Sequence, residues 1–129
     1  MKSLSILVAD DEDSIRSLLE HFFRAEGHAV LVVGNARQAV EVMAKQPFDL
    51  VITDVLMPDG DGLDLITELR KRQPAARILA MSGGGRYLEG SDYLKLAKGL
   101  GAHAAIMKPF TLEEMRAAMK AALERPVDA

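Results

Sequence analysis

The sequence predicts an α/β fold in which a parallel sheet is covered by helices on both faces. Short apolar runs rich in β-branched residues, typical of buried strands, alternate along the chain with segments of helical apolar periodicity. This alternation predicts parallel strands joined by right-handed crossovers through the helices. A length of 129 residues, of which 49% are apolar, suits one domain with one core, so we expect a single domain over residues 1–129.

The composition also argues against several classes of function. The formal net charge is −3 and the basic residues are scattered, so we expect no direct binding to nucleic acid. The absence of cysteine excludes disulfides and thiolate metal sites. The first residues do not form a signal peptide, and no apolar run is long enough to span a membrane. We therefore expect a soluble, cytoplasmic protein with no membrane partner.

Five strands and five helices can be placed in order. The strands are expected at Leu4 to Ala9, His28 to Val33, Phe48 to Thr53, Ala76 to Met81 and Ala102 to Met107. The helices are expected from Ser14 to Gly27, from Asn35 to Pro47, from about Asp61 to Arg72, from Tyr93 to Leu100, and from Thr111 to Pro126. Asn35 with Gln38, and Thr111 with Glu114, have the spacing of helix-capping pairs. The pattern fits a flavodoxin-like, doubly wound sheet with strand order 2-1-3-4-5.

The stretch from residue 50 to 62 is the centre of the functional prediction. An apolar run ends at Asp54, and Pro58 biases Met57 away from helix, so the chain must turn just after this aspartate. Gly60 and Gly62 allow a tight turn. Asp54 therefore lies at the carboxyl end of a strand, where open α/β sheets bind their ligands. The alternative is a turn aspartate that caps the next helix.

Other chemically active side chains also follow predicted strands. Asp10 and Asp11 follow the first strand, Ser82 the fourth and Lys108 the fifth. In the predicted strand order the first and third strands are neighbours, which brings Asp10 and Asp11 close to Asp54. Like charges about 4 Å apart repel by roughly 4 kcal/mol at an effective dielectric constant near 20. Such a cluster requires raised pKa values or a bound cation.

The ligands in this cluster indicate the kind of cation and the chemistry. Carboxylate and carbonyl oxygens favour Mg²⁺, with Mn²⁺ as a second candidate. Lys108 adds a positive charge and Ser82 a hydroxyl donor, and the glycines from Gly83 onward let backbone N–H groups approach an anion. Together these groups could hold a phosphoryl group on Asp54. Taken singly, each residue has an ordinary explanation as a helix cap, a solvated charge or a flexible loop.

Over nearly its whole length the sequence resembles the receiver domain of bacterial two-component response regulators. The resemblance rests on four motifs: Asp10-Asp11 after an apolar run, Asp54 with Met57-Pro58 and Asp61-Gly62, Met81-Ser82-Gly83, and Lys108-Pro109-Phe110. It implies that Asp54 is the phosphoacceptor, that Ser82 is the hydroxyl that moves to the phosphoryl group, and that Lys108 is its cationic partner. Gly83 is expected to contact the phosphoryl group through its backbone. The resemblance also implies a cis peptide bond between Lys108 and Pro109.

The metal ligands follow from the same resemblance. It implies that Asp11 and Asp54 bind Mg²⁺ directly, that Asp10 acts through water, and that the backbone carbonyl of Leu56 completes the protein ligands. The expected function is that of a phosphoacceptor in two-component or phosphorelay signalling. A sensor histidine kinase or a histidine phosphotransfer protein would donate the phosphoryl group to Asp54, and the phosphorylated form would bind different partners. We expect a stand-alone receiver and not an enzyme, apart from slow self-dephosphorylation.

Two departures from the family pattern concern the residues that pass the phosphorylation signal on to a partner. An aromatic residue or histidine usually lies three positions before the lysine, and here that position is Ala105. The segment between Ser82 and Lys108 is also longer than usual and includes three glycines in a row. We therefore expect the segment from Ser82 to Leu94 to be the most mobile part of the protein and to carry the signal.

Three other classes of protein share part of this pattern. The nearest is a Mg²⁺-dependent phosphohydrolase with Asp54 as nucleophile, but its haloacid-dehalogenase type needs a second aspartate where this chain has Leu56. A calcium-binding loop in the acidic stretch from Asp59 to Asp64 would need a glycine at its sixth position and a closing glutamate, and the chain has neither. A nucleotide-binding domain would need a glycine-rich loop after the first strand, where this chain is acidic. Labelling of Asp54 by a phosphodonor would separate the receiver from these alternatives.

Overall fold

The computed structural model describes residues 3–57, 60–83 and 90–124. Its centre is a five-stranded parallel sheet in the order β2-β1-β3-β6-β7. The strands are β1 (Ser5–Ala9), β2 (Ala29–Val33), β3 (Leu50–Asp54), β6 (Arg77–Ser82) and β7 (Ala104–Met107). Since β6 and β7 are the fourth and fifth strands of this sheet, the predicted order 2-1-3-4-5 is confirmed.

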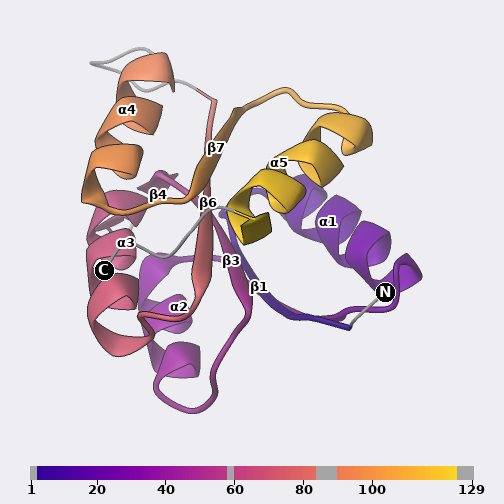
Figure 1. Ribbon diagram of the computed structural model, residues 1–129, viewed down its shortest axis with the longest axis horizontal. Coiled ribbons are helices and arrows are strands. Elements are labelled where there is room, and N and C mark those ends of the chain that lie inside the picture. The colour runs from indigo at the N-terminus through magenta and orange to yellow at the C-terminus, as the bar shows by residue number, and fades with distance from the viewer. Residues whose placement is uncertain (1–2, 58–59, 84–89, 125–129) are drawn as a thin grey trace.

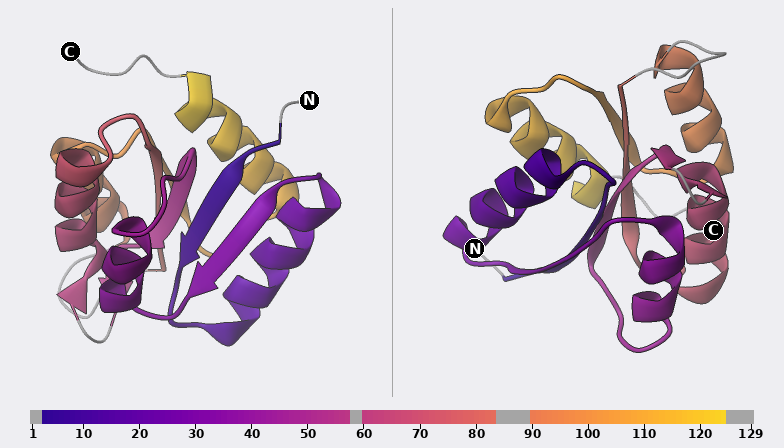
Figure 2. Two further views of the ribbon diagram at one scale, coloured as in Figure 1. Left: turned by 90° about the horizontal axis from the view of Figure 1, so that it is seen from below. Right: turned by 180° about the vertical axis from the view of Figure 1, so that it is seen from behind.

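Helices cover both faces of the sheet (Figures 1 and 2). One layer contains α1 (Asp13–Ala25) and α5 (Leu112–Glu124), and the other contains α2 (Ala36–Met43), α3 (Gly62–Arg72) and α4 (Gly90–Leu100). Within the described residues, no helix is both long and apolar enough to cross a membrane. The architecture is therefore the three-layer arrangement that the alternating pattern predicted.

The sheet separates two apolar cores. Ile6 and Val8 of β1 pack toward α1 and α5, whereas Leu7 and Ala9 pack toward α2, α3 and α4. This division follows from the strand geometry, in which successive side chains point to opposite faces. The interior strands are buried on both faces, which explains why they read as continuous apolar runs rather than as alternating patterns.

Local signals placed most element boundaries to within a few residues. Asn35 caps α2, because its side chain accepts a hydrogen bond from the backbone N–H of Gln38 at 2.8 Å. Thr111 and Glu114 form the predicted capping box before α5, with reciprocal bonds of 2.8 and 3.0 Å. Helix α4 begins earlier than predicted, at Gly90. The segment in which we expected the greatest mobility lies partly outside the described residues, at 84–89.

One pair of short strands was not predicted. Strand β4 (Leu56–Met57) pairs antiparallel with β5 (Gly60–Asp61) directly after β3. The expected turn after Asp54 is therefore a small hairpin that leads into α3. Two residues per strand are too few for any period-2 pattern to reveal them in the sequence.

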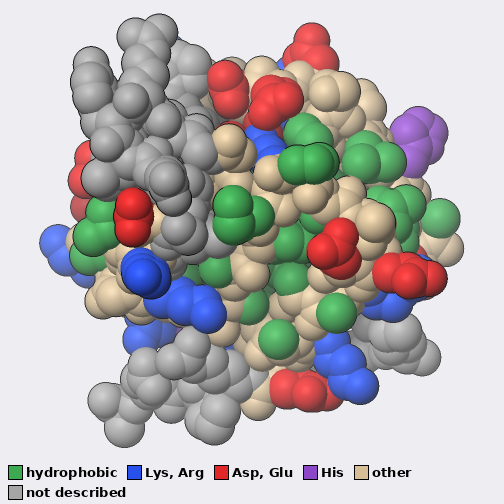
Figure 3. Space-filling view, turned by 90° about the horizontal axis from the view of Figure 1, so that it is seen from above, with side chains coloured by type: hydrophobic (Ala, Val, Ile, Leu, Met, Phe, Trp, Pro, Cys, Tyr) green, Lys and Arg blue, Asp and Glu red, His purple; other side chains and the backbone are tan. Residues whose placement is uncertain are grey.

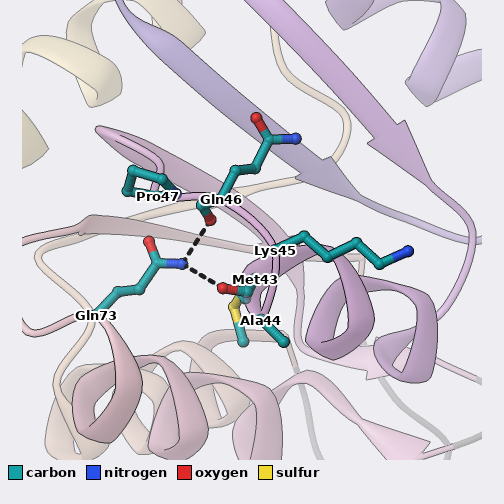
Figure 4. Close-up of a pocket in the computed structure, with 6 residues that line it drawn as sticks. All are labelled: Met43, Ala44, Lys45, Gln46, Pro47 and Gln73. Carbon is teal, nitrogen blue, oxygen red and sulfur yellow. Dashed lines mark hydrogen bonds between the residues drawn. The ribbon is translucent and has the colours of Figure 1, made fainter.

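Gln73 fixes the connection between α2 and β3 at the amino-terminal edge of the sheet (Figure 4). Its side-chain Nε2 donates to the carbonyl oxygens of Met43 and Gln46 at 3.0 and 2.9 Å, and its Oε1 accepts from the backbone N–H of Phe48 at 2.9 Å. One amide thus satisfies carbonyls that the end of a helix leaves without partners. This contact ties the end of α3 to the chain that leads into the central strand.

Candidate functional site

The predicted site residues lie at the carboxyl-terminal edge of the sheet. Asp10 follows β1, Asp54 ends β3, Ser82 ends β6 and Lys108 follows β7. Figure 3 shows this side of the molecule, with acidic side chains grouped beside a largely covered basic one. The parallel topology thus brings together residues that are nearly 100 positions apart in the sequence.

The ammonium group of Lys108 lies among three carboxylates. Its Nζ is 2.7 Å from Oδ2 of Asp10, 2.8 Å from Oε1 of Glu12 and 2.9 Å from Oδ2 of Asp54. The contacts with Glu12 and Asp54 are hydrogen bonds, whereas Asp10 Oδ2 meets the ammonium as an ion pair without hydrogen-bond alignment. Three negative charges therefore share one positive charge.

The turn between β1 and α1 fixes Asp10 in place. Its backbone N–H donates to the carbonyl of Val33 at 3.1 Å, which continues the pairing of β1 with β2. Its Oδ1 accepts the backbone N–H of Glu12 at 2.8 Å, and its carbonyl accepts Nη1 of Arg16 at 2.7 Å. With the side chain also fully buried, Asp10 has little freedom to move.

Burial and charge act in opposite directions on the two buried groups of the cluster. Burial raises the pKa of the Asp10 carboxyl above its ordinary value, against the lowering effects of Lys108 and of the Glu12 amide. Burial lowers the pKa of Lys108, but its contacts with Asp10, Glu12 and Asp54 outweigh burial and hold that pKa above its ordinary value. Lys108 is therefore a permanent cation at neutral pH, while a buried ionised Asp10 is costly.

Ser82 and Gly83 approach the cluster from the end of β6. The backbone N–H of Lys108 donates to the carbonyl of Ser82 at 2.8 Å, which joins the ends of β6 and β7. A Cβ on Gly83 would lie 3.6 Å from Cδ of Lys108, so the glycine backbone is in contact range of the lysine side chain. The Lys108–Pro109 bond is cis, which confirms that prediction.

The carboxylates that could hold a cation are not the three that were predicted, because Glu12 takes the place of Asp11 beside Asp10 and Asp54. Ligand oxygens of Asp10, Glu12 and Asp54 lie within 4.8 Å of one another, and such oxygens are the donors that Mg²⁺ prefers. The residues present therefore fit a divalent cation. Asp11 lies on the exposed bend beside this group. Sequence reasoning missed Glu12, since an acidic run of four residues does not show which side chain reaches the lysine.

Two further residues discussed from the sequence, Leu56 and Ala105, lie on β4 and β7. Leu56, whose carbonyl was the fourth expected metal ligand, begins β4 at the end of β3. Ala105 lies on β7 and packs, half-buried, against the core shared with α2, α3 and α4. The place usually taken by an aromatic residue therefore lies on the sheet face that α4 covers.

A comparison with known families agrees with the motifs and the geometry. Residues 6–120 match the family described as the response regulator receiver domain. The chain belongs to this family. As a receiver domain it has the phosphoacceptor role in two-component signalling.

Relatives of different lengths share this receiver domain. Sporulation initiation phosphotransferase F of Bacillus subtilis is 32% identical over 93% of this chain and 94% of its own length. The DNA-binding transcriptional regulator NtrC of Azospirillum brasilense is 39% identical, but the chain spans only 25% of that protein. Among solved structures, the chemotaxis response regulator CheY4 of Vibrio cholerae superposes with a TM-score of 0.83 at 25% identity, covering 95% of this chain and 100% of its own.

Proposed function

We infer that Asp54 is the residue that accepts the phosphoryl group. The observation that carries this proposal is its position at the end of β3, hydrogen-bonded to Lys108 and beside the buried Asp10. A carboxylate oxygen of Asp54 would attack the phosphorus of a phosphohistidine, and the P–N bond would break as the imidazole leaves with the electron pair. Lys108 would then balance charge on the phosphoryl oxygens, aided by the Ser82 hydroxyl and the Gly83 backbone.

Metal binding is part of the same proposal. Asp10, Asp11 and Asp54, with the carbonyl of Leu56, would hold Mg²⁺, and Mn²⁺ could replace it because its ligand preference is similar. When bound, the cation supplies positive charge between the carboxylates and the phosphoryl oxygens. Support for a cation at this position comes from the close spacing of the Asp10 and Asp54 carboxylate oxygens, whose third neighbour is Glu12.

The partners follow from this chemistry. We propose a sensor histidine kinase or a histidine phosphotransfer protein as donor, acting in the cytoplasm, and a downstream protein that distinguishes the two forms. Because the Asp54 carboxylate carries the phosphoryl group as an acyl phosphate, water would hydrolyse it slowly without a further catalytic residue. This slow self-dephosphorylation resets the domain and does not make it an enzyme for other substrates.

Labelling by a small phosphodonor tests the proposal. Wild-type protein incubated with Mg²⁺ and acetyl phosphate should gain one phosphoryl group by intact-mass spectrometry, and Asp54→Asn should gain none. Asp49→Asn is a matched control, because Asp49 immediately precedes the same strand at its opposite end. The Asp49→Asn protein should gain one phosphoryl group as the wild type does. Undiminished labelling of Asp54→Asn, or of wild-type protein in EDTA, would contradict the assignment.

A further inference from the structure

Glu12 forms a contact with the site that its position in the helix does not require. It is the N-cap residue of α1, but its side chain makes no capping hydrogen bond. Its carboxylate instead accepts a hydrogen bond from Lys108 at 2.8 Å, across 96 positions of sequence. The local backbone thus leaves this side chain available to the lysine.

The three carboxylates around Lys108 differ in how easily they could release it. Asp10 is fully buried, and Asp54 is the proposed reacting group with only 9% of its side chain exposed. Glu12 has 53% of its side chain exposed. An exposed carboxylate regains water when it leaves an ion pair, whereas a buried one loses its counter-charge without replacement. Glu12 is therefore the partner that Lys108 can exchange at the lowest free-energy cost.

Lys108 faces such a competition if the proposed function is correct. Of the three N–H donors of its ammonium group, two already donate to Glu12 and Asp54, and the buried carboxylate of Asp10 lies 2.7 Å from the nitrogen as a third negative charge. A phosphoryl group on Asp54 brings new oxygens that need the same positive charge. Glu12 and the phosphoryl group thus compete for one cation.

We propose that Glu12 is a positioning residue that holds Lys108 before phosphorylation and releases it to the phosphoryl group. This inference rests on the proposed function and adds a control on it. The hydrogen bond to Glu12 lowers the affinity of the site for a phosphoryl group and so limits how strongly the phosphorylated form is stabilised. A half-exposed ion pair of this kind is worth about a two- to fivefold change in an equilibrium constant.

Two substitutions at Glu12 distinguish the effect of its hydrogen bond to Lys108 from the effect of its negative charge. Glu12→Gln removes the charge. Glu12→Asp keeps the charge but shortens the side chain by one methylene, and aspartate at an N-cap favours the helix amides over a distant lysine. Asp13→Asn is the matched control, because it removes one charge from the next residue, whose exposed carboxylate contacts Arg16 and not Lys108.

The measurement is the affinity for beryllofluoride, a phosphoryl mimic, followed by ¹⁹F NMR at Mg²⁺ concentrations that saturate each variant. Both Glu12 variants should bind it about two- to fivefold more tightly than wild type, while Asp13→Asn should not change. If Glu12→Asp matched wild type while Glu12→Gln and Asp13→Asn rose together, charge alone would explain the gain and the proposal would be overturned. Unchanged affinity in all three variants would also overturn it, whereas failure of the wild type to bind would overturn the proposed function itself.

Discussion

Asp10 lowers the stability of the fold when it is ionised, although the proposed site needs its carboxylate. Its carboxylate is fully buried, and its pKa is raised because burial outweighs the attraction of Lys108. The folded chain therefore takes up a proton at this position more readily than the unfolded chain. At neutral pH an ionised Asp10 lowers the free energy of unfolding.

Replacing Asp10 with asparagine should stabilise the protein. The amide oxygen can still accept the Glu12 N–H, and Lys108 keeps Glu12 and Asp54 as partners, so no buried charge is left uncompensated. We expect a gain of about 1–2 kcal/mol at pH 7 in EDTA, measured by urea unfolding. The gain should shrink as pH falls through the raised pKa of Asp10 toward 3.8, because the wild-type carboxyl is then neutral too. A loss of stability at pH 7 would contradict this account.

The sequence identified most of the residues in the site but not how they are paired. Asp10, Asp54, Ser82 and Lys108 could be placed at the edge because each follows an apolar run in an alternating pattern. Glu12 could not, because its role depends on a side-chain conformation and on a lysine that only the folded sheet brings near it. The alternation of strands and helices is a property of local sequence, whereas the choice among neighbouring carboxylates is a property of packing.

Two strands of the sheet are each preceded by a buried histidine. His28 precedes β2 and accepts the backbone N–H of Leu4, and His103 precedes β7 and accepts the backbone N–H of Ile78, each through Nδ1 at 3.0 Å. Both histidines extend the pairing of their strand by one side-chain bond. Strands β2 and β7 begin one and two residues later than the apolar runs suggested, and at β7 the N–H of Ala102 donates to the carbonyl of Ala97 in α4 and not to the sheet.

Replacing His103 with phenylalanine should destabilise the edge of the sheet. The buried N–H of Ile78 would lose its acceptor, and an unsatisfied buried donor costs about 1–3 kcal/mol. The free energy of unfolding in urea gives the total effect, and faster exchange of the Ile78 amide would locate it. His21→Phe, on the exposed face of α1, is the control and should change stability much less. Equal effects of the two substitutions would show that the hydrogen bond contributes little.

At the scale of the whole molecule, the acidic edge should link cation binding to stability. A ligand that binds only the folded state stabilises it by about 2.7 kcal/mol at a hundred times its dissociation constant. Mg²⁺ should therefore raise the melting temperature in a concentration-dependent way. Asp11→Asn should weaken this dependence if Asp11 is a ligand, as proposed. An undiminished response in Asp11→Asn would favour Glu12 as the third carboxylate ligand in its place.

The strand order also determines the mechanical stiffness of the site. Asp10 and Asp54 follow or end the adjacent interior strands β1 and β3, each paired on both sides and packed against a helical layer on each face. Lys108 follows β7, which among the described residues is an edge strand with β6 as its one neighbour. The spacing between the two acids is therefore stiff, and the position of the lysine is more compliant. A force applied at the edge strand would displace the ammonium group of Lys108 before it changed the distance between Asp10 and Asp54.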